Sequence, residues 1–205
     1  MKTITFLSQK GGSGKSTLAV HVAVAASQAK ERVAIIDTDP QKSVLTWSQH
    51  REAETPVVVV ATSSEITAVL EAAKHDQMSL CIVDTAPHTA PDVSRVASAS
   101  DLLVIPVRPA AFDLMAVAAS VTMAKALKVP AVLVLSACPP RAPEIDEARE
   151  VLKDYGLPVY SGQITDRRAF ARALISGRAV TEFDAEGKAA AEIRSLWKWL
   201  KGRIR

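Results

Sequence analysis

Apolar residues recur along the chain in short continuous runs that alternate with longer segments of helical periodicity. The runs are rich in β-branched residues and cover 3–8, 33–37, 57–60, 80–84, 102–107, 131–135 and 159–161. Helical patterns fill 15–29, 43–51, 64–75, 91–98, 113–127, 144–155, 167–176 and 185–201. Runs that are apolar at every position, rather than at alternate ones, are typical of parallel strands covered on both faces. The pattern therefore predicts an α/β fold, a doubly wound and mostly parallel sheet with helices on both faces.

The same pattern gives no sign of a domain boundary. The chain has 205 residues and contains no internal repeat and no low-complexity linker. Its one stretch rich in helix breakers, 138–143, follows an apolar run and is interpreted as a loop. This length suits one domain with a substantial core. We expect residues 1–205 to form a single domain.

Hydrophobic content and cysteine usage favour a cytoplasmic protein. Hydrophobic residues make up 48% of the chain, but no run approaches the roughly 18 consecutive apolar residues of a membrane span. The first apolar run begins almost at Met1, which leaves no room for a signal peptide. Cys81 lies in an apolar run and Cys138 precedes two prolines. These two residues are better explained as buried or free thiols than as a disulfide framework.

A glycine-rich segment links the first apolar run to the first helical segment. Residues 9–17 read Gln-Lys-Gly-Gly-Ser-Gly-Lys-Ser-Thr. A glycine-rich turn at a helix N-terminus leaves backbone N–H groups facing an anion at the positive end of the helix dipole. Lys15 can reach the terminal phosphates of a nucleotide, Ser16 can hold Mg²⁺ and Thr17 can donate to the α-phosphate. The segment is therefore predicted to be a phosphate-binding loop.

This loop departs from the common pattern in a way that is itself a known motif. Gln9 stands where the common loop has its first glycine, and Lys10 follows it. The run Lys-Gly-Gly-x-Gly-Lys-Ser-Thr matches in full the deviant Walker A motif of the ParA/MinD family of ATPases. Residues 37–41 resemble the second motif of that family, and residues 81–84 resemble its Walker B strand. In size and layout the chain is similar to the small ParF-like plasmid partition ATPases.

Three aspartates are predicted to lie beside this loop, at the carboxyl ends of strands. Asp84 is placed to hold Mg²⁺ through a bound water, with capping of the next helix as the alternative role. The resemblance implies that Asp39 positions or activates the attacking water and that Asp37 supports the metal site. The expected metal site is thus Ser16, Asp37 and Asp84. A turn at 39–40 is a further interpretation of this segment and is compatible with the first, because Asp-Pro favours turns.

The resemblance gives Lys10 a distinct role. In ParA/MinD relatives the corresponding lysine reaches across a dimer interface to the phosphates of the partner's nucleotide, like an arginine finger in trans. It implies an ATP-dependent homodimer with Lys10, Lys15 and Asp39 as catalytic residues; an ordinary surface lysine is the alternative. Base recognition maps to 136–137 and 165–166. The implied nucleotide-binding residues are Lys10, Gly11, Gly12, Ser13, Gly14, Lys15, Ser16, Thr17, Thr165 and Asp166.

Basic charge is concentrated toward the C-terminal end. The net charge is +3, yet residues 163–205 contain ten Lys/Arg and five Asp/Glu, against fifteen and seventeen in the rest. Such an excess is an electrostatic footprint for an anionic polymer, with a solvated helix face as the alternative. ParA relatives bind DNA without sequence preference near this end. The candidate DNA contacts are Arg167, Arg168, Arg172, Arg178 and Lys188.

The last helical segment allows two interpretations. Residues 193–205 are amphipathic and basic and carry two tryptophans, as a helix lying on a membrane surface does. Positions 193, 196, 197, 200 and 204, however, follow the i, i+3, i+4 stripe of a helix packed on a core. We favour packing on the core, with Trp199 left partly exposed, and do not expect membrane binding.

The resemblance implies a ParA-type ATPase that uses ATP and Mg²⁺, dimerises on ATP and binds nucleoid DNA nonspecifically. It would partition a plasmid with a ParB/ParG-like centromere-binding partner that stimulates slow hydrolysis. No helix-turn-helix extension of the longer partition ATPases is expected, since the first strand begins almost at Met1. The alternative is a related positioning ATPase for a protein cargo or a membrane-associated assembly. A ligase or a metal-cluster carrier of the same superfamily fits less well, because residues 37–41 are partition-like and the cysteines lack Cys-x-x-Cys spacing.

Overall fold

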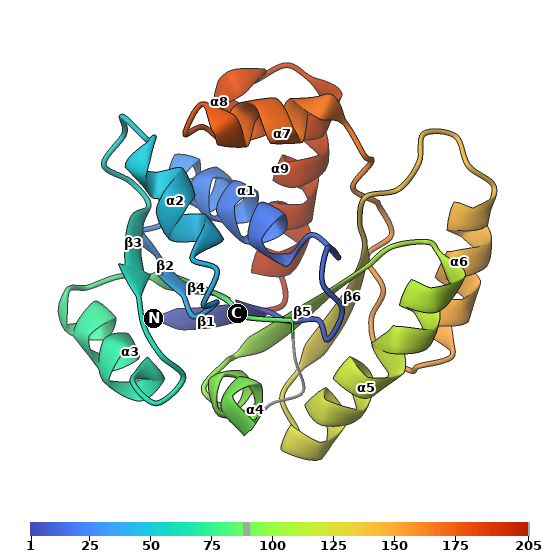
Figure 1. Cartoon of the computed structure of the whole chain (residues 1–205), viewed down its shortest axis with the longest axis horizontal. Helices are drawn as coiled ribbons and strands as arrows, with labels where there is room; N and C mark the ends of the chain where they lie inside the picture. Colours follow the sequence, from blue (N-terminus) through green and yellow to red (C-terminus); the bar gives the residue numbers. More distant parts are fainter. Residues whose placement is uncertain (88–90, 205) are drawn as a thin grey trace.

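Continuous apolar runs form a parallel sheet, as the sequence predicts. The computed structural model describes residues 1–87 and 91–204. Within these ranges every pairing in the six-stranded sheet is parallel, and β1 lies between β4 and β5 in the order β3-β2-β4-β1-β5-β6 (Figure 1). The strands are β1 (Lys2–Phe6), β2 (Val33–Asp37), β3 (Val57–Val60), β4 (Leu80–Asp84), β5 (Leu102–Val107) and β6 (Ala131–Leu135).

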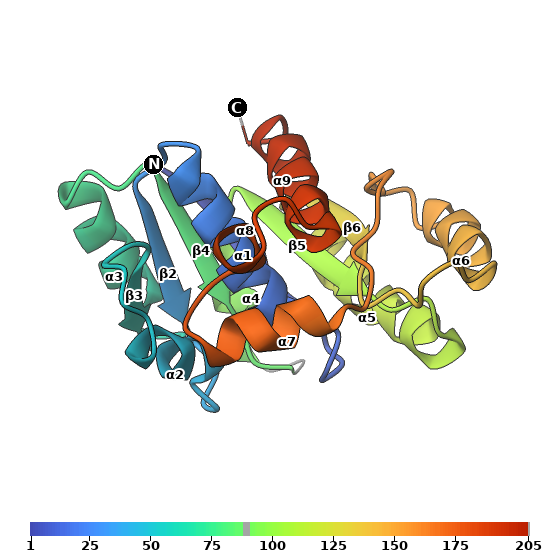
Figure 2. The same ribbon diagram turned by 90° about the horizontal axis from the view of Figure 1, so that it is seen from above.

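Helices cover both faces of the sheet, which confirms the predicted fold class. One face carries α1 (Lys15–Gln28), α2 (Ser43–Gln49), α7 (Arg168–Ile175), α8 (Val180–Phe183) and α9 (Lys188–Lys201). The opposite face carries α3 (Ile66–His75), α4 (Pro91–Ser98), α5 (Ala111–Leu127) and α6 (Glu144–Lys153). Figure 2 shows α1, α7 and α9 lying over the strands on the first face. The loops at the carboxyl ends of β1, β2 and β4 meet at one edge, where ligands of doubly wound sheets bind.

The predicted strand at 159–161 is wrong. Val159 makes only an isolated bridge to Leu133 of β6, and a second bridge joins Thr165 to Cys138. The chain leaves β6 at Ser161 and Gly162, and it returns only when Ile164 donates to the carbonyl of Leu135. Two short contacts separated by a turn do not make a continuous ladder.

Glycines also divide the C-terminal helices more finely than the sequence pattern predicts. Gly177 has a φ of +67°, a left-handed conformation that ends α7. The short helix α8 then follows, which the pattern does not predict. Gly187 precedes α9, so that this helix begins at Lys188 rather than at residue 185.

The apolar stripe of α9 packs on the core, as predicted. Its apolar side chains are buried against the cluster that also holds α1, and Trp199 is half-buried with its ring 5.1 Å from that of Tyr160. The buried positions are Ile193, Leu196, Trp197, Leu200 and, just beyond the helix, Ile204. Because this stripe is covered by the protein, it offers no face to a membrane. None of the helices within residues 1–87 and 91–204 is long and apolar enough to cross a bilayer.

His21 joins α1 to the C-terminal helices inside the core. The side chain is fully buried, and its Nδ1 accepts the backbone N–H of Val180 at 3.1 Å. The imidazole also meets the ring of Phe170 edge-on, with centroids 5.0 Å apart. Burial lowers the pKa of His21 to about 3, so the ring is neutral at physiological pH.

Candidate functional site

The loop between β1 and α1 has the backbone shape that phosphate binding requires. Gly12 and Gly14 have φ angles of +74° and +96°, conformations that other residues rarely adopt. Gly14 immediately precedes the first residue of α1. The Ser136 hydroxyl at the end of β6 donates to the Ser13 carbonyl at 2.6 Å, which holds the loop against the sheet. The N-terminal N–H groups of α1 therefore open toward the neighbouring cavity, as an anion site needs.

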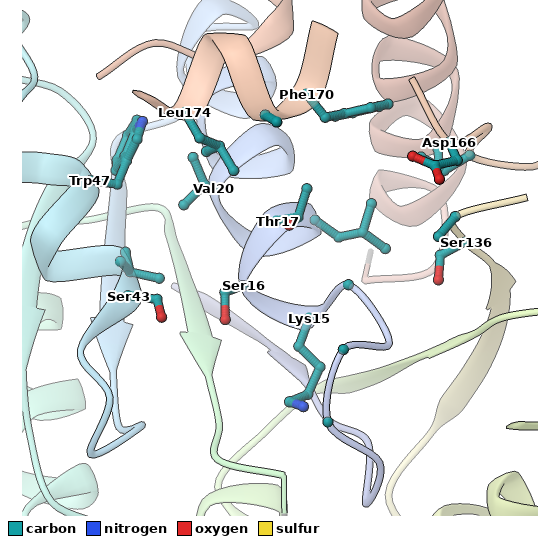
Figure 3. Close-up of a pocket in the computed structure, with 18 of the residues that line it drawn as sticks. Lys15, Ser16, Thr17, Val20, Ser43, Trp47, Ser136, Asp166, Phe170 and Leu174 are labelled. Carbon is teal, nitrogen blue, oxygen red and sulfur yellow. The ribbon is translucent and has the colours of Figure 1, made fainter. Parts of the chain in front are cut away.

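A cavity of about 890 Å³ extends from this loop between α1, α2 and α7 (Figure 3). Its volume lies within the range of small-molecule sites, roughly 300–1,000 Å³. Lys15, Ser16 and Thr17 lie at one end, while Ser136 and Asp166 lie to one side (Figure 3). Apolar side chains from the helices above form part of its wall, among them Val20, Trp47, Phe170 and Leu174.

The two lysines of the loop are both engaged within the chain. Lys15 is buried, and its Nζ lies 3.5 Å from the carbonyl oxygen of Lys10. Burial lowers the pKa of Lys15, and the carboxylates of Asp84 and Asp39 partly counteract this. Lys10 instead directs its ammonium outward from the loop and donates to the carboxylate of Asp113 at 2.5 Å. The structure therefore places Lys15 in the cavity and Lys10 outside it.

Asp84 fits a divalent cation. It is fully buried at the end of β4, and neither of its carboxylate oxygens has a hydrogen-bond partner within the described part of the chain. Burial raises the pKa of Asp84 to about 7, and the nearby Ser16 hydroxyl, which lies outside hydrogen-bond geometry, offsets only part of this rise. A buried carboxylate without a donor is costly unless a cation neutralises it. Asp84 and Ser16 are therefore the residues that would hold a metal ion.

The surroundings of Asp84 favour Mg²⁺ over a metal held entirely by protein ligands. Within residues 1–87 and 91–204 no group of three or more His, Cys, Asp or Glu side chains could hold a metal ion. Mg²⁺ keeps several waters and takes one or two carboxylates together with substrate phosphates. A site with one unpartnered carboxylate and one hydroxyl beside a phosphate loop suits that preference.

Asp37, which is expected to support the metal site, accepts three backbone N–H groups with its carboxylate. Its Oδ1 accepts the N–H of Asp39 at 3.1 Å, and its Oδ2 accepts the N–H groups of Val44 and Leu45 at 3.0 Å. Burial raises the pKa of Asp37, and these N–H groups lower it in part. The carboxylate thus fastens the start of α2 to the end of β2.

Asp39 lies beside the phosphate loop, at the carboxyl end of β2. It is buried and lines the cavity near Lys15. Its Oδ1 accepts the N–H of Gln41 at 2.9 Å, which gives the segment the turn that Asp-Pro favours. Both interpretations of this segment are therefore compatible with the geometry.

The loop proposed for base recognition is held by a residue that sequence reasoning missed. Glu192 of α9 accepts the N–H and the hydroxyl of Thr165, both at 2.9 Å, and it also pairs with Arg167 at 2.8 Å. Asp166 lies on the exposed side of this loop and lines the cavity. The hydroxyls of Ser136 and Thr165 are thus both committed to protein partners. A single glutamate in an amphipathic helix carries no local signal of such a role.

The candidate DNA-contacting residues differ in their exposure and in their partners. Arg168 and Arg172 are exposed and lie one turn apart on α7, where they share a face. Arg178 and Lys188 are exposed as well. Arg167, in contrast, is half-buried, lines the cavity and pairs with Glu192. The structure therefore separates Arg167 from the other four.

Known proteins resemble this chain in both sequence and structure. Residues 4–180 match the model of the CobQ/CobB/MinD/ParA nucleotide binding domain. Maintenance of carboxysome distribution protein A of Gloeobacter kilaueensis is 31% identical over 93% of this chain and 89% of its own. The protein of the same name from Halothiobacillus neapolitanus is 26% identical, over 93% and 91%. Protein ParA of Rhizobium radiobacter is 32% identical, over 55% and 51%.

Solved structures show the same fold at lower identity. The apo structure of Cyanothece McdA superposes with a TM-score of 0.81 at 15% identity and covers all of both chains. An ATP complex of a Cyanothece McdA variant has a TM-score of 0.78 at 16% identity, over 98% of this chain and 96% of that one. With a family model that covers most of its length and a relative 31% identical along 93% of it, the chain belongs to the ParA/MinD family of deviant Walker A ATPases.

Proposed function

We propose that this chain is a positioning ATPase whose cargo is a large protein assembly. The proposal rests on the share of this chain that aligns with each relative. Both carboxysome distribution proteins align with 93% of this chain, whereas the plasmid-type ParA aligns with 55%. This difference favours the protein-cargo alternative over plasmid partition. The cargo would be of the carboxysome type, an assembly that must be spread through the cell.

The positions of four side chains support a role in ATP hydrolysis. Lys15, buried in the cavity, neutralises the terminal phosphates. Ser16 and Asp84 would hold Mg²⁺, which supplies positive charge to the phosphates when bound. Asp39 orients the attacking water at the same edge of the sheet. Lys10 crosses to the nucleotide of a second copy, so ATP links two subunits and hydrolysis releases them. We expect hydrolysis to be slow until a cargo-bound partner accelerates it.

The dimer is proposed to bind DNA through exposed basic residues. Arg168, Arg172, Arg178 and Lys188 are exposed, and a dimer would present two such sets. Each phosphate contact releases counterions, so doubling the contacts steepens the salt dependence of binding. Binding to nonspecific duplex DNA should therefore require ATP and fall steeply with salt. Substituting the four residues by alanine should abolish it, while Lys153→Ala on the remote helix α6 should leave it unchanged.

Imaging cells with and without this chain tests the choice of cargo. In cells that lack it, protein assemblies that are normally spread out should collapse into clusters, while resident plasmids are inherited as before. Lys10→Ala should reproduce the clustering at normal expression. Evenly spread assemblies together with plasmid loss would refute the proposal and favour partition.

Plasmid partition is the second candidate, and the resemblance to a ParA protein supports it. In that case the stimulating partner would be a ParB/ParG-like protein bound to a centromere. The two candidates share the ATP-dependent dimer and the nonspecific DNA surface. They differ only in what the partner is attached to, which the imaging experiment distinguishes.

A further inference from the structure

The ammonium group of Lys10 is neutralised by a carboxylate of its own chain. Its Nζ donates to Oδ2 of Asp113 at 2.5 Å. Asp113 lies in the first turn of α5 and is only 8% exposed, whereas the side chain of Lys10 is 40% exposed. One partner is thus fixed in the protein, while the other can swing into solvent.

The backbone of Lys10 is held in the same arrangement. Its N–H donates to the Ser8 hydroxyl at 3.2 Å, and its carbonyl oxygen lies 3.5 Å from Nζ of Lys15. Lys15 is the lysine that must move to the phosphates when a nucleotide enters. Both lysines are thus held by groups of their own chain.

Two large apolar side chains flank Asp113 on the surface. Phe112 is 80% exposed and Met115 is 72% exposed, and the two lie three residues apart at the start of α5. Apolar side chains exposed side by side are typical of protein contact sites. Here they border the residue that holds Lys10, which must reach a second copy of the chain.

We propose that Asp113 is a positioning residue that parks Lys10 in the monomer, and that a second copy of this chain docks on Phe112 and Met115 and releases it. This inference rests on the proposed ATP-dependent dimer. A carboxylate in cis and a phosphate in trans compete for one ammonium group. The pair with Asp113 is broken when Lys10 crosses, so it stabilises the monomer and opposes dimerisation. The Lys10–Asp113 pair therefore adds a free-energy cost to dimerisation, and only the phosphates of ATP in the second subunit compensate for this cost.

Neutralising Asp113 should lower this free-energy cost of dimerisation. With a nonhydrolysable ATP analogue, sedimentation velocity should give an Asp113→Asn dimer dissociation constant about two- to fivefold below that of the unmodified chain. The gap should narrow at high salt, since salt screens the partly exposed pair. Asp113→Glu, which keeps the charge, should remain close to the unmodified chain. Glu150→Gln breaks an exposed ion pair on α6 and should change nothing.

A change in the stability of Asp113→Asn would not by itself distinguish parking from a structural role, whereas a change in its dimer dissociation constant would. A carboxylate in the first turn of a helix also stabilises the helix itself, so Asp113→Asn can lower the melting temperature without any role in parking. A merely structural role would weaken the dimer or leave it unchanged. Tighter dimerisation together with equal or lower stability is the result that only parking predicts.

A second pair of variants tests the docking surface. Replacing Phe112 and Met115 together by serine should weaken the dimer at least tenfold, whereas Val151→Ser, at an exposed apolar position on α6, should not. If the unmodified chain stays monomeric with the analogue, the proposed function fails. If it dimerises but Asp113→Asn has an unchanged or weaker dimer, parking alone is overturned. If the double serine variant dimerises normally, the docking surface is overturned.

Discussion

Replacing the buried His21 by asparagine should remove a defined pH dependence from the stability of the fold. The pKa of His21 is lowered by burial from 6.5 to about 3 in the folded chain. As the pH falls below 6.5, His21 takes up a proton in the unfolded chain, whereas in the folded chain it stays neutral. The stability due to the neutral ring is therefore present above this pH and is lost progressively toward pH 3.

The magnitude follows from the two pKa values. Between about pH 8 and about pH 5, linkage gives a loss of about 2 kcal/mol from this residue alone. The amide side chain of the His21→Asn variant would not titrate, and its Oδ1 could still accept the N–H of Val180 that Nδ1 accepts now. The pKa of Asp84, raised by burial to about 7, gives a dependence of opposite sign, but this is common to both proteins. The difference between the two pH dependences therefore isolates His21.

The assay is urea unfolding of both proteins without nucleotide, at the two pH values. Between them the unmodified chain should lose about 2 kcal/mol more than His21→Asn, although the variant is less stable throughout. Equal losses in the two proteins would refute the reasoning. They would mean that His21 is either accessible to water in the folded chain or able to accept a proton there.

Three further predictions concern the nucleotide site. Lys10→Ala should abolish ATP-dependent dimerisation and hydrolysis, while calorimetry shows unchanged ADP binding to the monomer; normal turnover would contradict the role in trans. Asp84→Asn should remove the Mg²⁺ dependence of ATP binding and raise the free energy of unfolding at pH 8 by about 1–3 kcal/mol, because a buried unpartnered carboxylate is lost; lower stability would argue against an unpartnered charge. Glu192→Gln should weaken ATP binding about fivefold but leave tripolyphosphate binding intact, since it loosens only the loop at Thr165; equal losses for both ligands would contradict this.

The strands and their parallel pairing could be predicted from the chain because each is a continuous run of apolar residues. Residues 80–84, for example, are buried at every position, as a central strand requires. The segment 159–161 has a similar composition but turns away at Gly162, and composition does not reveal where a chain leaves a sheet. The helix α8 has only four residues, which is too few for a periodic pattern.

The glycine-rich turn between β1 and α1 could be predicted because its residues are adjacent in sequence. Asp113 and Glu192 could not, because they lie 103 and 27 residues from the groups they hold, Lys10 and Thr165. Each also has an ordinary explanation as a polar residue of an amphipathic helix. The resemblance maps Ser136 to base recognition and gives no sign that its hydroxyl also donates to the carbonyl of Ser13. Side chains that organise a binding loop from a distance leave no local pattern.

The packing of α9 against α1 has a consequence for how the chain folds during synthesis. Helix α1 leaves the ribosome long before α9, which covers it, and the two lie side by side in both views (Figures 1 and 2). Contacts between such distant segments form slowly, because the intervening chain must first be ordered. Until α9 emerges, the apolar surface of α1 stays open to water and Thr165 lacks its anchor on Glu192. A nascent chain therefore carries its phosphate loop long before it has the core that supports nucleotide binding.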